Sequence, residues 1–324
     1  MAFDVSALTA YVEQEHDTLL VKALFSSKSA TLFQSAGQVL PGVKSSKDLP
    51  ILSNTVYMQA DGCGYTSSGT TTLSKRNLEV GAVKVEETLC PKTLEDYWYQ
   101  KKMAAGSATE VPFGEVIADA KVKQINEKIE TMIWVGNTNS GDPNLNKWNG
   151  FITILEALGF GGAGDPIKGD ANSTNFTSIT TSNIDDIADQ IYTLMPDAVL
   201  ERDDAFIAMG TDNFRTYCQW LRSANLFHYA VDGGAFAAGG QPNFQYHPGT
   251  NVKVYGLPGL SGTNKMVGSY LANFFIGTDL MNEEEEFKMW YSQDNDEVRT
   301  RVTFKYGCQI AFPDQVVFFN LTDS

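Results

Sequence analysis

The residue types that most often carry catalysis are scarce in this sequence. It has only three histidines, His16, His228 and His247, and its four cysteines are widely separated. The contexts that mark a nucleophilic serine or a zinc protease, GxSxG, SxxK and HExxH, do not occur. Cys218 and His228 are close enough in sequence to form a thiol–imidazole pair, but no third group marks them as one. We therefore predict that the chain is not an enzyme.

Two further patterns suggest ligand binding but lack the context that binding requires. Gly159, Gly161 and Gly164 match GxGxxG, yet DPIKGDANSTN follows, where a dinucleotide site needs the start of a helix. The oxygen-rich segments 137–139 and 294–296 lack the spacing of a calcium-binding loop, and no Cys/His cluster suits zinc. We interpret these segments as polar loops and expect no cofactor and no metal.

The composition is that of a globular protein with an acidic surface. The 324 residues are 43% hydrophobic and 19% charged, and 24 Lys and Arg against 39 Asp and Glu give a net charge of −15. This balance disfavours proteins that wrap nucleic acid, because those need a basic face. No segment approaches the roughly 18 apolar residues of a membrane span, and the N-terminus lacks the pattern of a secretory signal. Widely spaced cysteines favour free thiols in a reducing compartment.

The N-terminal segment of the chain is poorly suited to form a packed domain on its own. Residues 5–24 show a loose helical stripe of apolar side chains. Residues 25–50 then become rich in Ser, Lys, Gly and Pro. We interpret residues 1–48 as an extended arm.

A long β-hairpin is predicted next, within residues 49–91. Residues 54–60 and 78–89 alternate apolar and polar side chains, as strands do, and a polar stretch with several glycines lies between them. A two-stranded hairpin is marginal alone in water, so its apolar residues need cover from elsewhere in the chain or from another chain. The residues that we assign to an assembly interface at the hairpin tip are Tyr65, Lys75 and Arg76.

Helices and then strands fill the rest of the chain. A short helix is expected over 92–103, and the strongest helical pattern covers 112–134, which is about 35 Å of helix. Residues 150–230 alternate strand and helix, which is typical of an α/β layer. From 251 to the end, short strands separated by turns predominate. The apolar stripe of the long helix comprises Phe113, Ile117, Ala120, Ile125, Ile129 and Met132.

An arm and a long hairpin expose backbone and apolar side chains that gain nothing until another subunit covers them. The near absence of catalytic patterns together with these extensions therefore indicates an assembly protein. In the order of its elements the chain resembles the major capsid proteins of tailed bacteriophages, of the Hong Kong 97 type. Three segments also resemble that family in local sequence: WVGNTNSGDPNLNKWNGF, AFIAMGTDNFRTYCQWLR and VKVYGLPGLSGTNKMVGSYLANFFIGTDL.

The resemblance implies an α+β fold of the Hong Kong 97 type. That fold has an N-terminal arm, a hairpin called the E-loop, a long spine helix in a peripheral P-domain, and a central α/β A-domain. The ranges it implies are 1–48 for the arm, 49–91 for the E-loop, 92–148 and 286–313 for the P-domain, and 149–285 and 314–324 for the A-domain.

The resemblance also implies a function. The chain would assemble with itself, through hexamers and pentamers, into the icosahedral head that encloses the double-stranded DNA of a tailed phage, without sequence-specific binding and without a membrane. Scaffold, portal and decoration proteins are its further expected partners. The expected location is the virion, after assembly in the cytoplasm of the bacterial host. Some relatives cross-link a lysine of the E-loop to a neighbour; Lys75 is the candidate here, but no partner residue is evident in the sequence.

Three other functions stay open at this stage. The same fold builds encapsulins, which are compartment shells that hold a cargo enzyme. Another virion protein, such as a tail or cement protein, is a second alternative. An α/β hydrolase is the third, and it would need a perturbed titratable pair in a pocket.

Overall fold

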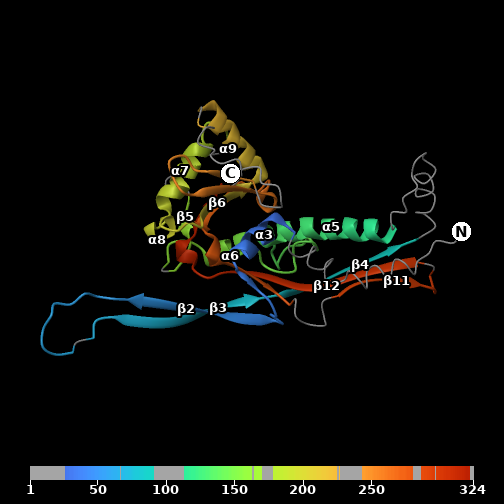
Figure 1. Cartoon of the computed structure of the whole chain (residues 1–324), viewed down its shortest axis with the longest axis horizontal. Coiled ribbons are helices and arrows are strands. Elements are labelled where there is room, and N and C mark those ends of the chain that lie inside the picture. Colours follow the sequence, from blue (N-terminus) through green and yellow to red (C-terminus); the bar gives the residue numbers. More distant parts are fainter. Residues whose placement is uncertain are drawn as a thin grey trace.

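The computed structural model describes residues 26–65, 67–90, 113–162, 164–169, 178–224, 226, 243–279, 286–295 and 297–321. The helices expected over 5–24 and 92–103 lie outside these residues. The described part forms a body of two sheets with their helices, from which one two-stranded hairpin projects (Figure 1).

A five-stranded sheet is built around its longest strand, β12. Tyr306 of β12 is paired with Gly81 of β4 on one side and with Thr278 of β10 on the other. β11 continues along the same edge of β12 as β10, and β1 adds to β10 in parallel. The strands are β1 (Val39–Leu40), β4 (Gly81–Leu89), β10 (Phe274–Thr278), β11 (Glu286–Ser292) and β12 (Glu297–Ile310).

Helix α5 (Phe113–Val135) lies along this sheet, as Figure 1 shows, and confirms the helix predicted over 112–134. Ile125, Ile129 and Met132 of the predicted stripe are buried in one cluster with alternate residues of β12. Ala120 was expected in that stripe and is exposed. The preceding turns instead bury Ala118 and Val122, because the buried face lies slightly to one side of the predicted one.

The second sheet has six strands in the order β5-β13-β9-β6-β8-β7. Its centre combines a parallel β6–β8 pair with an antiparallel β6–β9 pair. The strands are β5 (Ile167–Lys168), β6 (Ala205–Gly210), β7 (Asn243–Tyr246), β8 (Lys253–Leu257), β9 (Lys265–Tyr270) and β13 (Val317–Asn320). The associated helices are α6 (Phe151–Leu158), α7 (Ile184–Leu194), α8 (Asp197–Leu200), α9 (Thr211–Ser223) and the short η2 (Pro258–Leu260). α7, β6 and α9 confirm the alternation of helix and strand predicted within 150–230.

The six-stranded sheet is buried on both faces, and β6 shows why its sequence reads as an apolar run. Ile207 and Met209 pack in a cluster with α7 and α9. Phe206 and Ala208 point the other way, into the cluster that contains α5 and α6. Since successive strand residues alternate between faces, a strand covered on both sides is apolar at every position. Strand β6 therefore contributes side chains to two cores, one on each face of the sheet.

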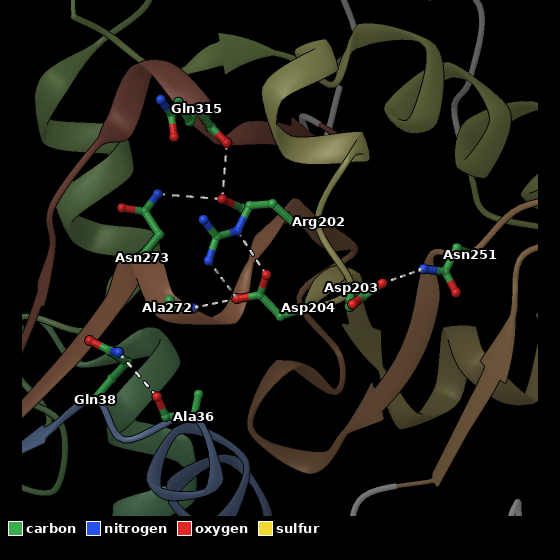
Figure 2. Close-up of polar contacts among 10 residues, drawn as sticks. Ala36, Gln38, Arg202, Asp203, Asp204, Asn251, Ala272, Asn273 and Gln315 are labelled. Carbon is green, nitrogen blue, oxygen red and sulfur yellow. Dashed lines mark hydrogen bonds and ion pairs between the residues drawn. The ribbon is translucent and has the colours of Figure 1, made fainter.

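The two sheets are joined where η3 (Leu271–Asn273) leads from β9 to β10 and η4 (Pro313–Gln315) leads from β12 to β13. The fully buried Asn273 fastens these two connections together. Its side-chain oxygen accepts from the Phe312 N–H at 2.7 Å, and its amide donates to the Phe312 carbonyl at 2.8 Å. Figure 2 shows Asn273 beside a further link, in which Asp204 accepts from the Ala272 N–H at 3.2 Å. β10 thus belongs to the five-stranded sheet, although the predicted range 149–285 placed it with the central unit.

The expectation of an unpacked arm up to residue 48 is wrong for its last part. Helix α3 (Lys28–Ser35) lies inside the body. The ring of Phe33 contacts the rings of Trp134, Phe151 and Phe274 at centroid distances of 5.4 to 6.1 Å. Ser27 caps the helix by accepting from the Ala30 N–H. Polar composition hid this segment, because only a few of its side chains are large and apolar.

A buried polar network ties α3 to α5. The Glu130 carboxylate accepts from the N–H of Ser29 at 2.8 Å and from its hydroxyl at 2.7 Å. The Trp134 indole N–H donates to the same hydroxyl at 2.7 Å. The Gly259 N–H of η2 also points at Glu130, at 3.4 Å. One carboxylate therefore fixes α3, α5 and η2 relative to one another.

The hairpin is present but its strands differ from the predicted ones. β2 (Ser46–Thr55) pairs with β3 (Thr70–Glu79), and the connection between them spans residues 56–69. The alternating segment expected as the return strand is instead β4, which pairs with β12. Its alternation reflects burial against the body on one face only. β3 escaped prediction because both of its faces are largely exposed, which leaves no apolar alternation to detect.

Candidate assembly surface

The hairpin carries nearly all of the exposed large apolar side chains in the described part of the chain. Six of the seven such residues belong to it, and only Phe160 lies elsewhere. Met58 and Tyr65 are 97% and 95% exposed. Scattered exposed apolar residues are ordinary, but a group gathered on one projection indicates a contact surface. The six residues are Leu52, Val56, Tyr57, Met58, Tyr65 and Leu73.

The pairing register separates the two faces of the hairpin stem. Leu52 is directly opposite Leu73, and both are exposed, at 57% and 75%. Leu49 and Leu78 point to the other face and are buried at the base of the hairpin. Cross-strand neighbours on one face touch, so Leu52 and Leu73 make one apolar patch. The base of the hairpin is thus part of the body. The remainder, from Leu52 through the connection to Leu73, projects from it and is called the free limb here.

The three predicted interface residues are not together at the tip. Tyr65 lies in the 56–69 connection, as expected. Lys75 and Arg76 lie in β3, opposite Pro50 and Leu49, in the basal half of the stem. Their placement at the tip is therefore wrong, because β3 begins at Thr70, eight residues before the return strand that was predicted to start at 78. Whether the three residues contact another subunit stays a prediction.

Both basic residues have partners within the subunit. The Lys75 ammonium is 2.7 Å from the Asp48 carboxylate, and this hydrogen bond raises the pKa of Lys75. The pair is exposed, so it adds little to stability. The Arg76 guanidinium donates to the Ile310 carbonyl at 3.5 Å, and partial burial lowers its pKa. Arg76 therefore fastens the hairpin to β12 rather than presenting a free charge.

A groove on the body lies between α5 and the free edge of β4. Its volume is about 240 Å³ and most of its lining is apolar, including Val85, Ile125 and Phe304. Lys121 borders it and forms an ion pair with Glu87 of β4. Among the described strands β4 pairs with β12 alone, so within this part of the chain the strand that borders the groove is an edge strand. Edge strands and apolar grooves are both surfaces on which another chain can pack.

Only some of the residues considered for catalysis lie within the described part of the chain. His16 and His228 lie outside the described residues, so the pairing of Cys218 with His228 is not tested. Burial raises the pKa of the Cys218 thiol, which disfavours a reactive thiolate. The loop after Gly159 leads through residues 164–166 to β5, and no helix begins there to hold a pyrophosphate.

His247 is a buried structural residue. Its Nε2 is 2.8 Å from an Asp189 carboxylate oxygen, and its Nδ1 is 3.2 Å from the Tyr217 hydroxyl. Both contacts suit a neutral ring that donates from Nε2 and accepts at Nδ1. Burial lowers the pKa of His247, and the attraction of Asp189 opposes that effect only in part. The histidine thus joins α7 and α9 to the turn between β7 and β8.

Two searches of the described residues have negative results. Among the helices described, none is both long and apolar enough to cross a membrane. Within the same residues, His, Cys, Asp and Glu side chains form no group of three that could hold a metal ion.

Comparison with known proteins identifies the fold. No protein-family model matches the chain, and no curated protein does. A chain of the satellite phage P4 procapsid including size determination (Sid) protein matches with a TM-score of 0.57 at 14% identity, over 94% of this chain and 98% of that one. The cyanophage A-1(L) capsid gives 0.56 at 13% identity, over 92% and 94%. The capsid of the Myoviridae phage XM1 gives 0.51 at 11% identity, over 89% and 91%.

These matches span almost the entire length of both chains in each comparison. The similarity therefore extends over most of the chain and is not confined to one local substructure. At identities of 11% to 14% it establishes a shared fold. This chain has the fold of phage capsid proteins, which confirms the fold-level resemblance seen in its sequence.

Sequence reasoning missed most of the exposed apolar residues of the hairpin. Val56, Tyr57 and Met58 fall in the segment that was predicted to be a strand and are part of the connection instead. Leu52 ends the apolar run 49–52, whereas Leu73 lies in a largely polar stretch of β3. For Leu73 the available signal was a single large apolar residue in a polar context, which a buried strand would not show.

Proposed function

We propose that this protein is the major capsid protein of a tailed phage, and that it assembles with itself through hexamers and pentamers into the head that encloses double-stranded DNA. The observation that carries the proposal is the free limb of the hairpin, whose apolar side chains have no partner surface within the described subunit. Burial of such side chains is the main favourable term in association, so the limb gains stability only against another chain.

The elements correspond to those of a Hong Kong 97-type subunit. In this proposal β2–β3 is the E-loop, α5 is the spine helix, the five-stranded sheet belongs to the P-domain, and the six-stranded sheet is the core of the A-domain. The order of elements along the chain and the fold-level similarity to phage capsid chains support this assignment. The arm would consist of residues before α3, since α3 itself is buried in the body.

We assign the α5–β4 groove as a receiving surface for the hairpin of a second copy. The groove is apolar and open, and the hairpin offers apolar side chains at the end of a long projection. The match in chemistry is the argument for this occupant. Every subunit would then donate one hairpin and receive another, so each contact is repeated around a closed ring.

The charge of the subunit suits a container. Like subunits of charge −15 repel, but at about 0.15 M salt the screening length is roughly 8 Å, so short-range apolar contacts can prevail. The same charge would keep enclosed DNA from adhering to the wall. Assembly in the host cytoplasm, with scaffold, portal and decoration proteins as further partners, completes the proposed role in the virion.

The test compares the full chain with a variant that lacks the hairpin tip. Thr55 and Thr70 are paired in register, so residues 56–69 can be replaced by Asn-Gly, which closes a two-residue turn. Negative-stain electron microscopy and sedimentation of the full chain should show closed shells or hexamer and pentamer rings. The shortened variant should remain a folded subunit at the same concentration. A full chain that stays a compact monomer at high concentration would overturn the proposal.

A further inference from the structure

Two glycines in the five-stranded sheet stand directly opposite each other. Gly277 of β10 is paired with Gly307 of β12. Neither has a positive φ, so the backbone does not require glycine at these positions. Glycine weakens a strand, and in the interior of a sheet it often marks a place where another backbone approaches closely.

The chain segment that approaches is the end of the hairpin. A Cβ added at Gly307 would lie 2.0 Å from the Glu79 carbonyl oxygen and 3.0 Å from the Val80 Cα. A Cβ added at Gly277 would lie 2.8 Å from a methyl group of the Leu78 side chain. The paired glycines thus leave a notch in the sheet, and residues 78–80 cross the sheet within it.

Further contacts hold the hairpin in this notch. The Val80 N–H donates to the Ser45 carbonyl at 3.0 Å, which closes the base of the hairpin. The Gln309 amide donates to the Asn77 carbonyl at 2.6 Å, two residues beyond Gly307 in β12. Leu78 has no exposed surface, whereas the stem residues beyond Ile51 are exposed. Among the described residues, the contacts that fix the direction of the free limb therefore lie at its base.

We propose that Gly277 and Gly307 are positioning residues: the notch they form sets the direction in which the hairpin leaves the body. This inference rests on the proposed capsid function, in which the direction of the hairpin determines where the apolar limb meets the neighbouring subunit. A side chain in the notch would tilt the hairpin without removing any residue from the apolar limb itself.

The size of the tilt follows from the geometry. The gap at Gly307 is about 1.5 Å shorter than an ordinary contact of about 3.5 Å. A displacement of that size over the two residues of the crossing, about 6.6 Å, is a tilt of roughly 13°. Thr70, where β3 begins, is ten residues of strand away from the notch, which is about 33 Å. The tip of the hairpin should therefore move by about 7 Å.

The experiment measures the direction of the hairpin by pulsed electron spin resonance. Cys63 is exposed in the connection between β2 and β3 and takes one spin label. The second label goes on the exposed position 198 of α8, in Ala198→Cys. Cys90→Ser and Cys218→Ser remove the other accessible thiols, and Cys308 is buried. Labelled protein is diluted with unlabelled full-length protein, so that only distances within one subunit are measured.

Gly307→Ala is the main variant, because the obstructing atom is backbone and cannot rotate away. Gly277→Ala is the milder one, because the obstructing atoms belong to the side chains of Leu78 and Val80. Leu78→Ala in the same chain removes the nearest of them and should reverse most of the shift. Gly141→Ala is the matched control, since an added Cβ there has nothing within 4 Å. We expect a shift of several ångströms in Gly307→Ala, a smaller one in Gly277→Ala, and none in the control.

Circular dichroism and thermal unfolding show which variants fold. If Gly307→Ala does not fold, the comparison of Gly277→Ala with its Leu78→Ala rescue decides the question. Unchanged distances in the folded glycine variants would overturn the inference, even if assembly were altered. A shifted distance in a protein that never forms rings or shells would support the notch and overturn the capsid function instead.

Discussion

Removing one apolar side chain from the free limb should weaken assembly and leave the subunit intact. Leu73 is 75% exposed in the subunit and pairs with Leu52 across the hairpin. Complete burial of a leucine side chain is worth about 1.5–3 kcal/mol, so covering Leu73 in an assembly should contribute about 1–2 kcal/mol per subunit. A free energy of about 1.4 kcal/mol corresponds to a tenfold change in an association constant. Leu73→Ala should therefore raise the critical concentration for assembly about 5- to 30-fold.

The assay is sedimentation over a concentration series, with electron microscopy of the pelleted material. Thr72→Ala is the matched control, because Thr72 is the next residue in the same strand and points to the opposite face. Its side chain is exposed and belongs to no apolar patch, so assembly should change little. The free energy of unfolding of both variants should stay within about 0.5 kcal/mol of the original, as for other surface substitutions.

Two results would refute this reasoning. If Leu73→Ala assembles at the same concentration as the unmodified chain, the patch is not covered in the assembly. If Leu73→Ala destabilises the isolated subunit by several kcal/mol, the side chain contributes to the fold and is not a free contact surface. An equal loss of assembly in Thr72→Ala would show that the hairpin is sensitive to any change.

Three further predictions concern the body. Phe33→Ala should lower the free energy of unfolding by about 3–5 kcal/mol, measured by denaturant titration, because the ring is buried among other aromatic rings; a change below about 1 kcal/mol would mean that α3 is not part of the core. Glu130→Gln should cost about 1–3 kcal/mol in the same assay, because both carboxylate oxygens accept from Ser29 and an amide nitrogen would face a donor. Burial lowers the pKa of His247 in the folded protein. The neutral ring therefore contributes its full stability above the unfolded pKa of about 6.5. As the pH falls below that value the contribution is lost, by at most about 1.4 kcal/mol per pH unit. Unfolding of His247→Gln should show a weaker pH dependence between 6.5 and 5, and an unchanged dependence would assign the effect to other groups.

Much of the regular structure could be predicted because its pattern is local. β9 and β11 are among the short strands predicted from residue 251 onward. α5 has a long apolar stripe and was expected within one residue at either end. In these segments the local pattern and the tertiary environment agree, so the pattern alone is informative.

The segments that were misjudged are those that depend on distant contacts. α3 has eight residues, too few to be a stable helix in isolation, and it is held by the rings of α5 and β10 and by the Glu130 carboxylate. β3 is exposed on both faces and therefore carries no alternation. For the candidate surface, the idea of an uncovered hairpin was right, whereas Lys75 and Arg76 were misplaced because the register of the stem is set by its base, at Leu49 and Leu78.

The division of the hairpin into a seated base and a free limb has a consequence for how assembly relates to folding. The base contributes Leu49 and Leu78 to the interior, whereas the limb beyond Leu52 contributes no buried side chain. Under the proposed capsid function, the body would therefore fold before any contact between subunits exists. The apolar surface of the limb then acts only through association, so its stabilising effect depends on subunit concentration and not on the stability of the fold. A subunit built in this way can remain a folded monomer at low concentration and assemble as it accumulates, without refolding its core.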